Sequence, residues 1–261
     1  MTNVLGIDIG SAFSKGIISR DQKVLASISI PSGADYKLSA DKVKKWLLSK
    51  TGLSSNDIDF TVATGYGSKT VEFADHIVTD ISCHSKGIAF LFPSVRTVID
   101  VGDLYSKAFR IDEKGNLLNF LLSGKCAGGS GRMLTVIAKI LHTNVEDIGD
   151  LSLKSRKRVD FGTGCVVFAE SEAVSRVAEG VAKEDLLAGI HRALSGQLKG
   201  LAVRIGIEKD FALVGGGAKD KGLIQAMQEA MDFDIIVPPE PQLTAALGAA
   251  IIAAKMSKSE G

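Results

Sequence analysis

A short segment of this sequence occurs twice. Residues 7–15 read Ile-Asp-Ile-Gly-Ser-Ala-Phe-Ser-Lys and residues 99–107 read Ile-Asp-Val-Gly-Asp-Leu-Tyr-Ser-Lys, with five of nine positions identical. Each copy follows an apolar run and leads into another strand-like run, so each predicts a β-hairpin. Chance is the alternative explanation, but the matched residues include Asp and Lys, which strands do not favour. The repeat therefore favours a chain built from two related lobes.

Strand-like and helix-like segments alternate along the chain, which indicates an α/β architecture. We expect one lobe in residues 1–95 and a second in residues 96–261, because each copy of the repeat opens near the start of its half. The expected strands are 4–9, 14–19, 24–30, 60–63, a run ending at 100–102, 106–111, 117–122, 211–214 and 234–237, and the expected helices are 40–48, 133–141, 169–178, 184–205 and an Ala-rich one at the end.

Composition excludes several classes of protein. The chain of 261 residues is 45% hydrophobic and 23% charged, as in ordinary soluble globular proteins. Its formal charge of +1 argues against a dedicated nucleic-acid binder. The uncharged apolar stretch 243–254 is shorter than the roughly 20 residues that cross a membrane. Three widely spaced cysteines make no disulfide framework and no leader is visible, so we expect a cytoplasmic protein.

Both copies of the repeat place an Asp-x-Gly turn at the end of a strand. Glycine permits a tight turn whose bare N–H groups suit phosphate oxygens, and the carboxylate suits Mg²⁺ or an attacking water. Asp8 and Asp100 are therefore the candidate catalytic residues. One such turn alone is more simply a β-hairpin, whereas a pair favours binding of a polyphosphate such as ATP or ADP. The candidate phosphate contacts are Gly10, Ser11, Ser14, Lys15 and Gly102.

A glycine triplet followed by alanine, Gly215-Gly216-Gly217-Ala218, comes after the expected strand 211–214. Such a loop lets a flat ligand or a phosphate approach the main chain closely. Together with the two Asp-x-Gly turns, it resembles the arrangement in the actin, acetate and sugar kinase, and Hsp70 superfamily. That resemblance implies a duplicated, ribonuclease H-like, two-lobe ATPase fold in which two phosphate hairpins and an adenosine loop surround ATP.

Two of the cysteines, Cys126 and Cys165, lie in turns of small residues just ahead of expected helices. There the positive end of the helix dipole would stabilise a thiolate or an anionic cluster. A four-cysteine cluster site needs four thiolates, so two chains related by a two-fold axis would have to share it. The alternative is that both cysteines are small buried side chains.

Five motifs carry a further resemblance, at residues 8–15, 63–67, 82–84, 125–132 and 165–172. They closely resemble one family, the activators (component A) of 2-hydroxyacyl-CoA dehydratases together with the ATP-binding subunits of benzoyl-CoA reductase. The resemblance implies a homodimer or a pair of related subunits that share a [4Fe–4S] cluster held by Cys126 and Cys165. It also implies ATP-driven transfer of one electron from a ferredoxin or flavodoxin to a downstream iron–sulfur dehydratase or reductase, and a packed Cys83.

The second Asp-x-Gly turn departs from that family. Activators usually continue as Gly-Gln-Asp where this chain has Asp103-Leu104-Tyr105. A carboxylate would repel the γ-phosphate, and a leucine cannot orient water by hydrogen bonding. We therefore predict slow or conditional ATP hydrolysis. The change is similar to that in the second, less regular ATP-binding subunit of some benzoyl-CoA reductases, which keeps a heterodimer open.

Two other functions remain open at this stage. One is a small-molecule kinase of the same fold, in which Asp100 would act as a base toward a substrate hydroxyl. That reading leaves the paired cysteine turns unexplained. The other is a non-hydrolysing partner subunit that helps to hold the cluster, which the altered second turn favours.

Overall fold

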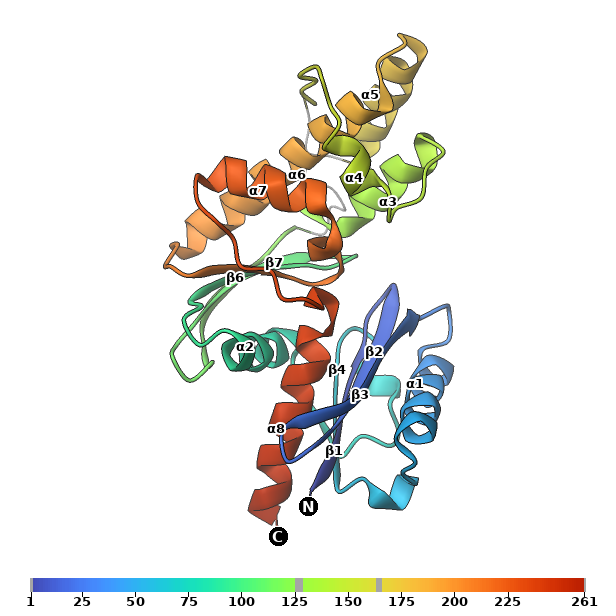
Figure 1. Ribbon diagram of the computed structural model, residues 1–261, viewed down its shortest axis with the longest axis vertical. Coiled ribbons are helices and arrows are strands. Elements are labelled where there is room, and N and C mark those ends of the chain that lie inside the picture. Colours follow the sequence, from blue (N-terminus) through green and yellow to red (C-terminus); the bar gives the residue numbers. More distant parts are fainter. Residues whose placement is uncertain (1, 125–128, 163–165, 261) are drawn as a thin grey trace. The chain divides into compact units, whose positions relative to one another are not determined.

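The computed structural model describes residues 2–124, 129–162 and 166–260 (Figure 1). The chain forms two compact units. Unit 1 contains residues 1–94, 111–117 and 243–261, and unit 2 contains residues 95–110 and 118–242. The expected second lobe, residues 96–261, included both 111–117 and 243–261. Those two segments pack in unit 1. The C-terminal helix completes the core on one face of its sheet, and the Lys86 ammonium donates to the Lys114 carbonyl and to Oδ1 of Asn116.

Unit 1 is a five-stranded sheet with helices on both faces (Figure 1). The strand order is β3-β2-β1-β4-β5, with β1 antiparallel to β2 and parallel to β4. Its elements are β1 (Asn3–Ile9), β2 (Phe13–Arg20), β3 (Lys23–Pro31), α1 (Tyr36–Thr51), η1 (Ser55–Asp57), β4 (Phe60–Thr64), η2 (Ser68–Thr70), β5 (His76–Ile77), α2 (Asp80–Leu91) and α8 (Thr244–Glu260).

The central strand β1 supplies both cores of unit 1, because successive side chains point to opposite faces. Leu5, Ile7 and Ile9 pack with the buried face of α1, whereas Val4 packs with α8. Gly6 lies on the α8 side, where an added Cβ would come within 2.2 Å of the Ala246 carbonyl oxygen. The missing side chain lets α8 approach the strand closely.

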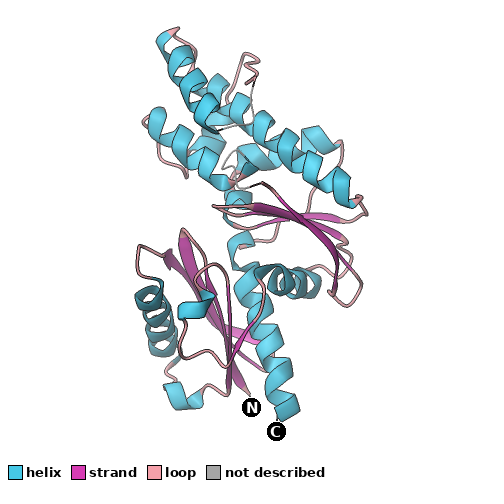
Figure 2. Ribbon diagram, turned by 180° about the vertical axis from the view of Figure 1, so that it is seen from behind, coloured by secondary structure: helices cyan, strands magenta, loops and turns pink. Residues whose placement is uncertain are grey.

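Unit 2 is a four-stranded sheet with its own helices gathered on one face (Figure 2). The strand order is β8-β7-β6-β9, with β6 antiparallel to β7 and parallel to β9. The elements are β6 (Thr97–Val101), β7 (Ser106–Ile111), β8 (Leu117–Leu122), α3 (Gly131–Ile140), α4 (Ile148–Ser152), α5 (Val166–Ala178), α6 (Lys183–Ile205), β9 (Phe211–Val214), η4 (Gly216–Lys219), α7 (Lys221–Met231) and η5 (Pro241–Leu243).

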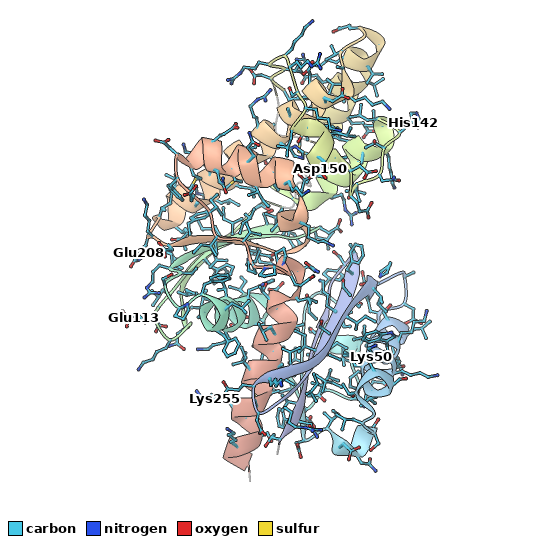
Figure 3. The ribbon with its side chains drawn as sticks, viewed as in Figure 1. Lys50, Glu113, His142, Asp150, Glu208 and Lys255 are labelled. Atoms are coloured by element: carbon cyan, nitrogen blue, oxygen red, sulfur yellow. The ribbon has the colours of Figure 1, made fainter. Side chains whose placement is uncertain are left out.

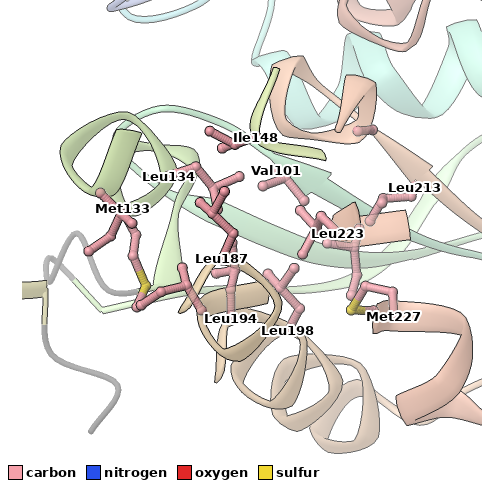
Figure 4. Close-up of a cluster of buried hydrophobic side chains, with 14 of the residues drawn as sticks. Val101, Met133, Leu134, Ile148, Leu187, Leu194, Leu198, Leu213, Leu223 and Met227 are labelled. Carbon is pink, nitrogen blue, oxygen red and sulfur yellow. The ribbon is translucent and has the colours of Figure 1, made fainter. Parts of the chain in front are cut away.

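A long apolar cluster joins the sheet of unit 2 to these helices (Figure 4). Val101 and Leu213 from the strands meet Leu187 and Leu194 of α6 and Leu223 of α7 in one buried group.

Most of the expected elements form, with one exception. The expected strand 234–237 is reduced to a single bridge between Ile236 and Ala212, so it adds no strand to the sheet. The helix α2 was not expected, although it is largely buried in unit 1.

Candidate functional site

The two copies of the repeat form two equivalent β-hairpins. Asp8 is the register partner of Lys15 across β1 and β2, and Asp100 is the register partner of Lys107 across β6 and β7. The Gly10 N–H donates to the Phe13 carbonyl at 3.0 Å, and the Gly102 N–H donates to the Tyr105 carbonyl at 3.1 Å. Each hairpin is therefore closed around a two-residue loop, Ser11-Ala12 in unit 1 and Asp103-Leu104 in unit 2.

Each repeat aspartate is buried and paired with the lysine across the hairpin. The Nζ of Lys15 donates to Oδ2 of Asp8 at 2.9 Å, and the Nζ of Lys107 donates to Oδ2 of Asp100 at 2.9 Å. The two carboxylates keep only 8% and 4% of their side-chain surface. The sequence repeat aligns Lys107 with Lys15, but Lys107 was not predicted as a site residue.

A glycine loop stands next to each buried carboxylate. Gly65 follows β4 with φ +88°, and a Cβ there would lie 2.2 Å from Oδ1 of Asp8. Gly215 follows β9 with φ +87°, and its Cβ would lie 2.2 Å from Oδ1 of Asp100. Both positions require glycine for conformation and for space. The loop at 65–67 is thus the counterpart of the loop at 215–217. In the sequence, residues 63–67 had stood out only as one motif of the family resemblance.

The glycine loop of unit 2 has one open position. A Cβ at Gly217 would meet the side chain of Val101 at 2.4 Å, whereas a Cβ at Gly216 would meet nothing within 4 Å. The main chain at Gly216 is therefore accessible to a ligand. Ala218 is 1% exposed and its side chain belongs to the core of unit 2, so it holds the loop in place from behind.

Ser14 is buried behind the first turn rather than displayed on it. Its Oγ lies 2.8 Å from the Oγ of Ser32, and the Ser32 hydroxyl donates to the Gly10 carbonyl at 2.7 Å. This chain of hydrogen bonds supports the turn. Ser11 lies in the two-residue loop itself and is partly exposed.

The altered residue of the second turn has a cationic partner. The Arg132 guanidinium donates to Oδ2 of Asp103 at 2.6 Å. The neighbouring Gly131 N–H donates to the Gly102 carbonyl at 2.8 Å. The start of α3 is therefore attached to the second turn by a backbone hydrogen bond and an ion pair.

The two cysteines that the resemblance singles out, Cys126 and Cys165, lie outside the described residues. The helices α3 and α5 follow them in the sequence, at Gly131 and Val166, and these helices contact each other. Within the described ranges, no three or more His, Cys, Asp or Glu side chains are placed to hold a metal ion.

Cys83 on α2 is fully buried, which confirms that it is packed. Burial raises the pKa of its thiol to about 12 because the charged thiolate would lose its hydration. A thiol of this kind is unreactive at neutral pH.

Over residues 2–124, 129–162 and 166–260, no helix is both long and apolar enough to span a membrane.

Known proteins resemble this chain over nearly its whole length. It is 42% identical over 260 residues to the 2-hydroxyisocaproyl-CoA dehydratase activator of Clostridioides difficile, covering 98% of this chain and 97% of the relative. It is 41% identical over 253 residues to the (R)-2-hydroxyglutaryl-CoA dehydratase activating ATPase of Acidaminococcus fermentans, covering 96% of each.

A solved structure shows the same fold. The activator of the 2-hydroxyisocaproyl-CoA dehydratase from Clostridium difficile with bound ADPNP superimposes with a TM-score of 0.95 at 40% identity, covering 99% of this chain and 97% of that one. The expected actin-like, two-lobe α/β fold is thereby confirmed. The BadF/BadG/BcrA/BcrD ATPase family matches residues 5–253, and the chain with its paired aspartate hairpins and glycine loops belongs to that family.

Proposed function

We propose that this protein is an ATP-dependent activator that passes a single low-potential electron to an iron–sulfur enzyme of the 2-hydroxyacyl-CoA dehydratase or benzoyl-CoA reductase kind. The observation that carries the proposal is the duplicated set of buried aspartate, hairpin turn and glycine loop, in a chain whose relatives are named dehydratase activators.

ATP binding is assigned to the backbone of the turns and of the open loop. The candidate contacts are Gly10, Ser11 and Gly102 at the turns and Gly215 to Gly217 at the loop. Asp8 and Asp100 are proposed to hold Mg²⁺ or its waters and to orient the attacking water. The ammonium groups of Lys15 and Lys107 hold these carboxylates in place through ion pairs at 2.9 Å.

The thiolates of Cys126 and Cys165 are proposed to hold a [4Fe–4S] cluster together with the same pair from a second subunit. The cluster supplies one-electron chemistry when bound. Support comes from the contact between α3 and α5, the two helices that follow the cysteines in the sequence. The second subunit is either another copy or a related chain, and a ferredoxin or flavodoxin is the proposed electron donor in the cytoplasm.

A second candidate is a non-hydrolysing subunit of the same kind of complex. It is favoured by the second turn, where Asp103 and Leu104 occupy the positions beside the expected γ-phosphate. Replacing 103–105 by Gly-Gln-Asp is expected to raise the steady-state ATPase rate at least tenfold if the turn limits hydrolysis. A native rate equal to that of ordinary activators would contradict slow hydrolysis.

The first experiment is the iron and acid-labile sulfide content of anaerobically purified protein. We expect about two irons per chain, since four are shared by two chains. Cys126→Ser and Cys165→Ser should each lose the iron. Cys83→Ser is the matched control and should keep it, because Cys83 is a packed thiol. Protein that stays free of iron after reconstitution but binds ATP would overturn the electron-transfer role and favour a kinase or a bare nucleotide-binding subunit.

A further inference from the structure

The two hairpin loops differ in charge at one equivalent position. The register places Ser11 in the first loop where Asp103 stands in the second, each directly after the glycine that closes its turn. A hydroxyl can donate a hydrogen bond to a phosphate oxygen, whereas a carboxylate only accepts. The second loop therefore carries an anion at a position where the first loop offers a donor.

Arg132 forms an ion pair with that anion. Its guanidinium lies 2.6 Å from the Asp103 carboxylate and keeps 48% of its side-chain surface exposed, whereas Asp103 keeps 20%. The adjacent Gly131 N–H is bonded to the Gly102 carbonyl, so the backbone beside Arg132 stays at the turn even if the ion pair opens. The guanidinium can therefore leave the carboxylate while remaining within reach of the same turn.

Among the ion pairs at this turn, the one between Asp103 and Arg132 is the one most easily exchanged. Asp100 is held by Lys107 at 2.9 Å, and both side chains of that pair are nearly inaccessible. The pair between Asp103 and Arg132 is more exposed, and exposed ion pairs contribute little to stability. Exchanging one oxyanion partner of Arg132 for another is therefore inexpensive.

We propose that Asp103 is a built-in competitor for the terminal phosphate of the bound nucleotide, and that Arg132 is the shared cation. Without nucleotide, the Arg132 guanidinium pairs with the Asp103 carboxylate. When a triphosphate binds at the second turn, Arg132 pairs with its terminal phosphate instead, since guanidinium pairs with phosphate oxygens as well as with carboxylates. The inference rests on the proposed function in that it takes ATP as the ligand of this turn. It adds that affinity for ATP relative to ADP is lowered by Asp103 and raised by Arg132.

The test is equilibrium binding of a non-hydrolysable ATP analogue and of ADP to the purified full chain. Asp103→Asn should tighten the analogue about fivefold and change ADP less than about twofold, because the removed charge faces the third phosphate. Arg132→Gln should weaken the analogue about tenfold, and Arg132→Lys should recover part of that loss because it restores the charge. In an Arg132→Gln background, Asp103→Asn should give a smaller gain, since there is no guanidinium to release.

The matched control is Glu208→Gln, which breaks a comparable ion pair with Arg110 elsewhere in unit 2 (Figure 3). It should leave both affinities unchanged. A purely structural role for Arg132 would lower stability without altering the ratio of the two affinities. An unchanged ratio in both single variants would overturn this inference alone. Failure of the wild-type chain to bind either nucleotide would overturn the proposed function as well.

Discussion

Asp8 and Asp100 are two buried aspartates, and the environment of each is set by the residues packed around it. Each carboxylate is buried, and burial of an unpaired charge would cost several kcal/mol. The lysine seven residues later compensates it because the antiparallel register puts the two side chains on one face of the hairpin. The repeated Asp and Lys could be found in the sequence. That Lys15 bonds to Asp8 depends on the register, and so it was assigned only as a phosphate contact. That assignment stays a prediction.

Gly215 gives a sharp test at the same scale. We expect Gly215→Ala to lower the free energy of unfolding by about 2–4 kcal/mol, because a Cβ there collides with the Asp100 carboxylate in a strained backbone conformation. Gly216→Ala is the control and should change stability by less than about 1 kcal/mol, since its Cβ meets nothing. Urea unfolding followed by circular dichroism measures both, and equal losses would show that the loop tolerates a side chain.

At the scale of elements, the pair α2 and α8 carries the most information about unit 1. Gly87 of α2 and Gly248 of α8 lie at their contact, where an added Cβ would meet main-chain atoms of the other helix at 2.1 and 1.7 Å. Nδ1 of His84 lies 2.7 Å from Oγ1 of Thr244, and both side chains are buried. The sequence did not reveal α2, because its small and polar residues carry little helical periodicity.

A glycine exchange tests this close contact. Gly248→Ala should destabilise the protein by at least about 3 kcal/mol, because two backbones would have to separate. Gly200→Ala in α6 is the matched control. Its Cβ would enter open space, and alanine favours a helix over glycine by up to about 1 kcal/mol, so that variant should be slightly more stable. Thermal unfolding of both variants measures the difference, and similar melting temperatures would exclude a tight contact between the helices.

At the scale of the whole molecule, each unit has its own sheet and its own core, but unit 1 is assembled from three separate segments of the chain. The long C-terminal helix α8 packs against β1 and β4 and buries Val4 and Val62. The fold of unit 1 therefore depends on the C-terminal helix α8 as much as on the N-terminal strands.

Truncation tests that dependence. A chain ending at Gln242 should lose the fold of unit 1 and be cleaved rapidly there by a protease, because the cluster around Val4 and Val62 loses its cover. Unit 2, with its own large core, should persist as a resistant fragment. A chain ending at Met256 keeps most of α8 and should resist like the full chain. If both units of the chain ending at Gln242 were cleaved equally fast, the two units would not fold independently.

The sequence by itself determined the local structure of the two hairpins, which is a strand, a tight turn and a second strand in each copy of the repeat. The repeated Ile-Asp-x-Gly and Ser-Lys residues, with strand-like runs around them, predicted two equivalent turns. The glycine triplet predicted the loop at 215–217, and the resemblance of this combination to the actin superfamily implied the fold. Only the tertiary structure showed that the loop at 65–67 is equivalent to that at 215–217 and that Arg132 forms an ion pair with Asp103. It also showed that α8 belongs with the first strands. These relations join residues far apart in the chain, and such contacts depend on sheet order and packing, which leave no fixed spacing in a sequence.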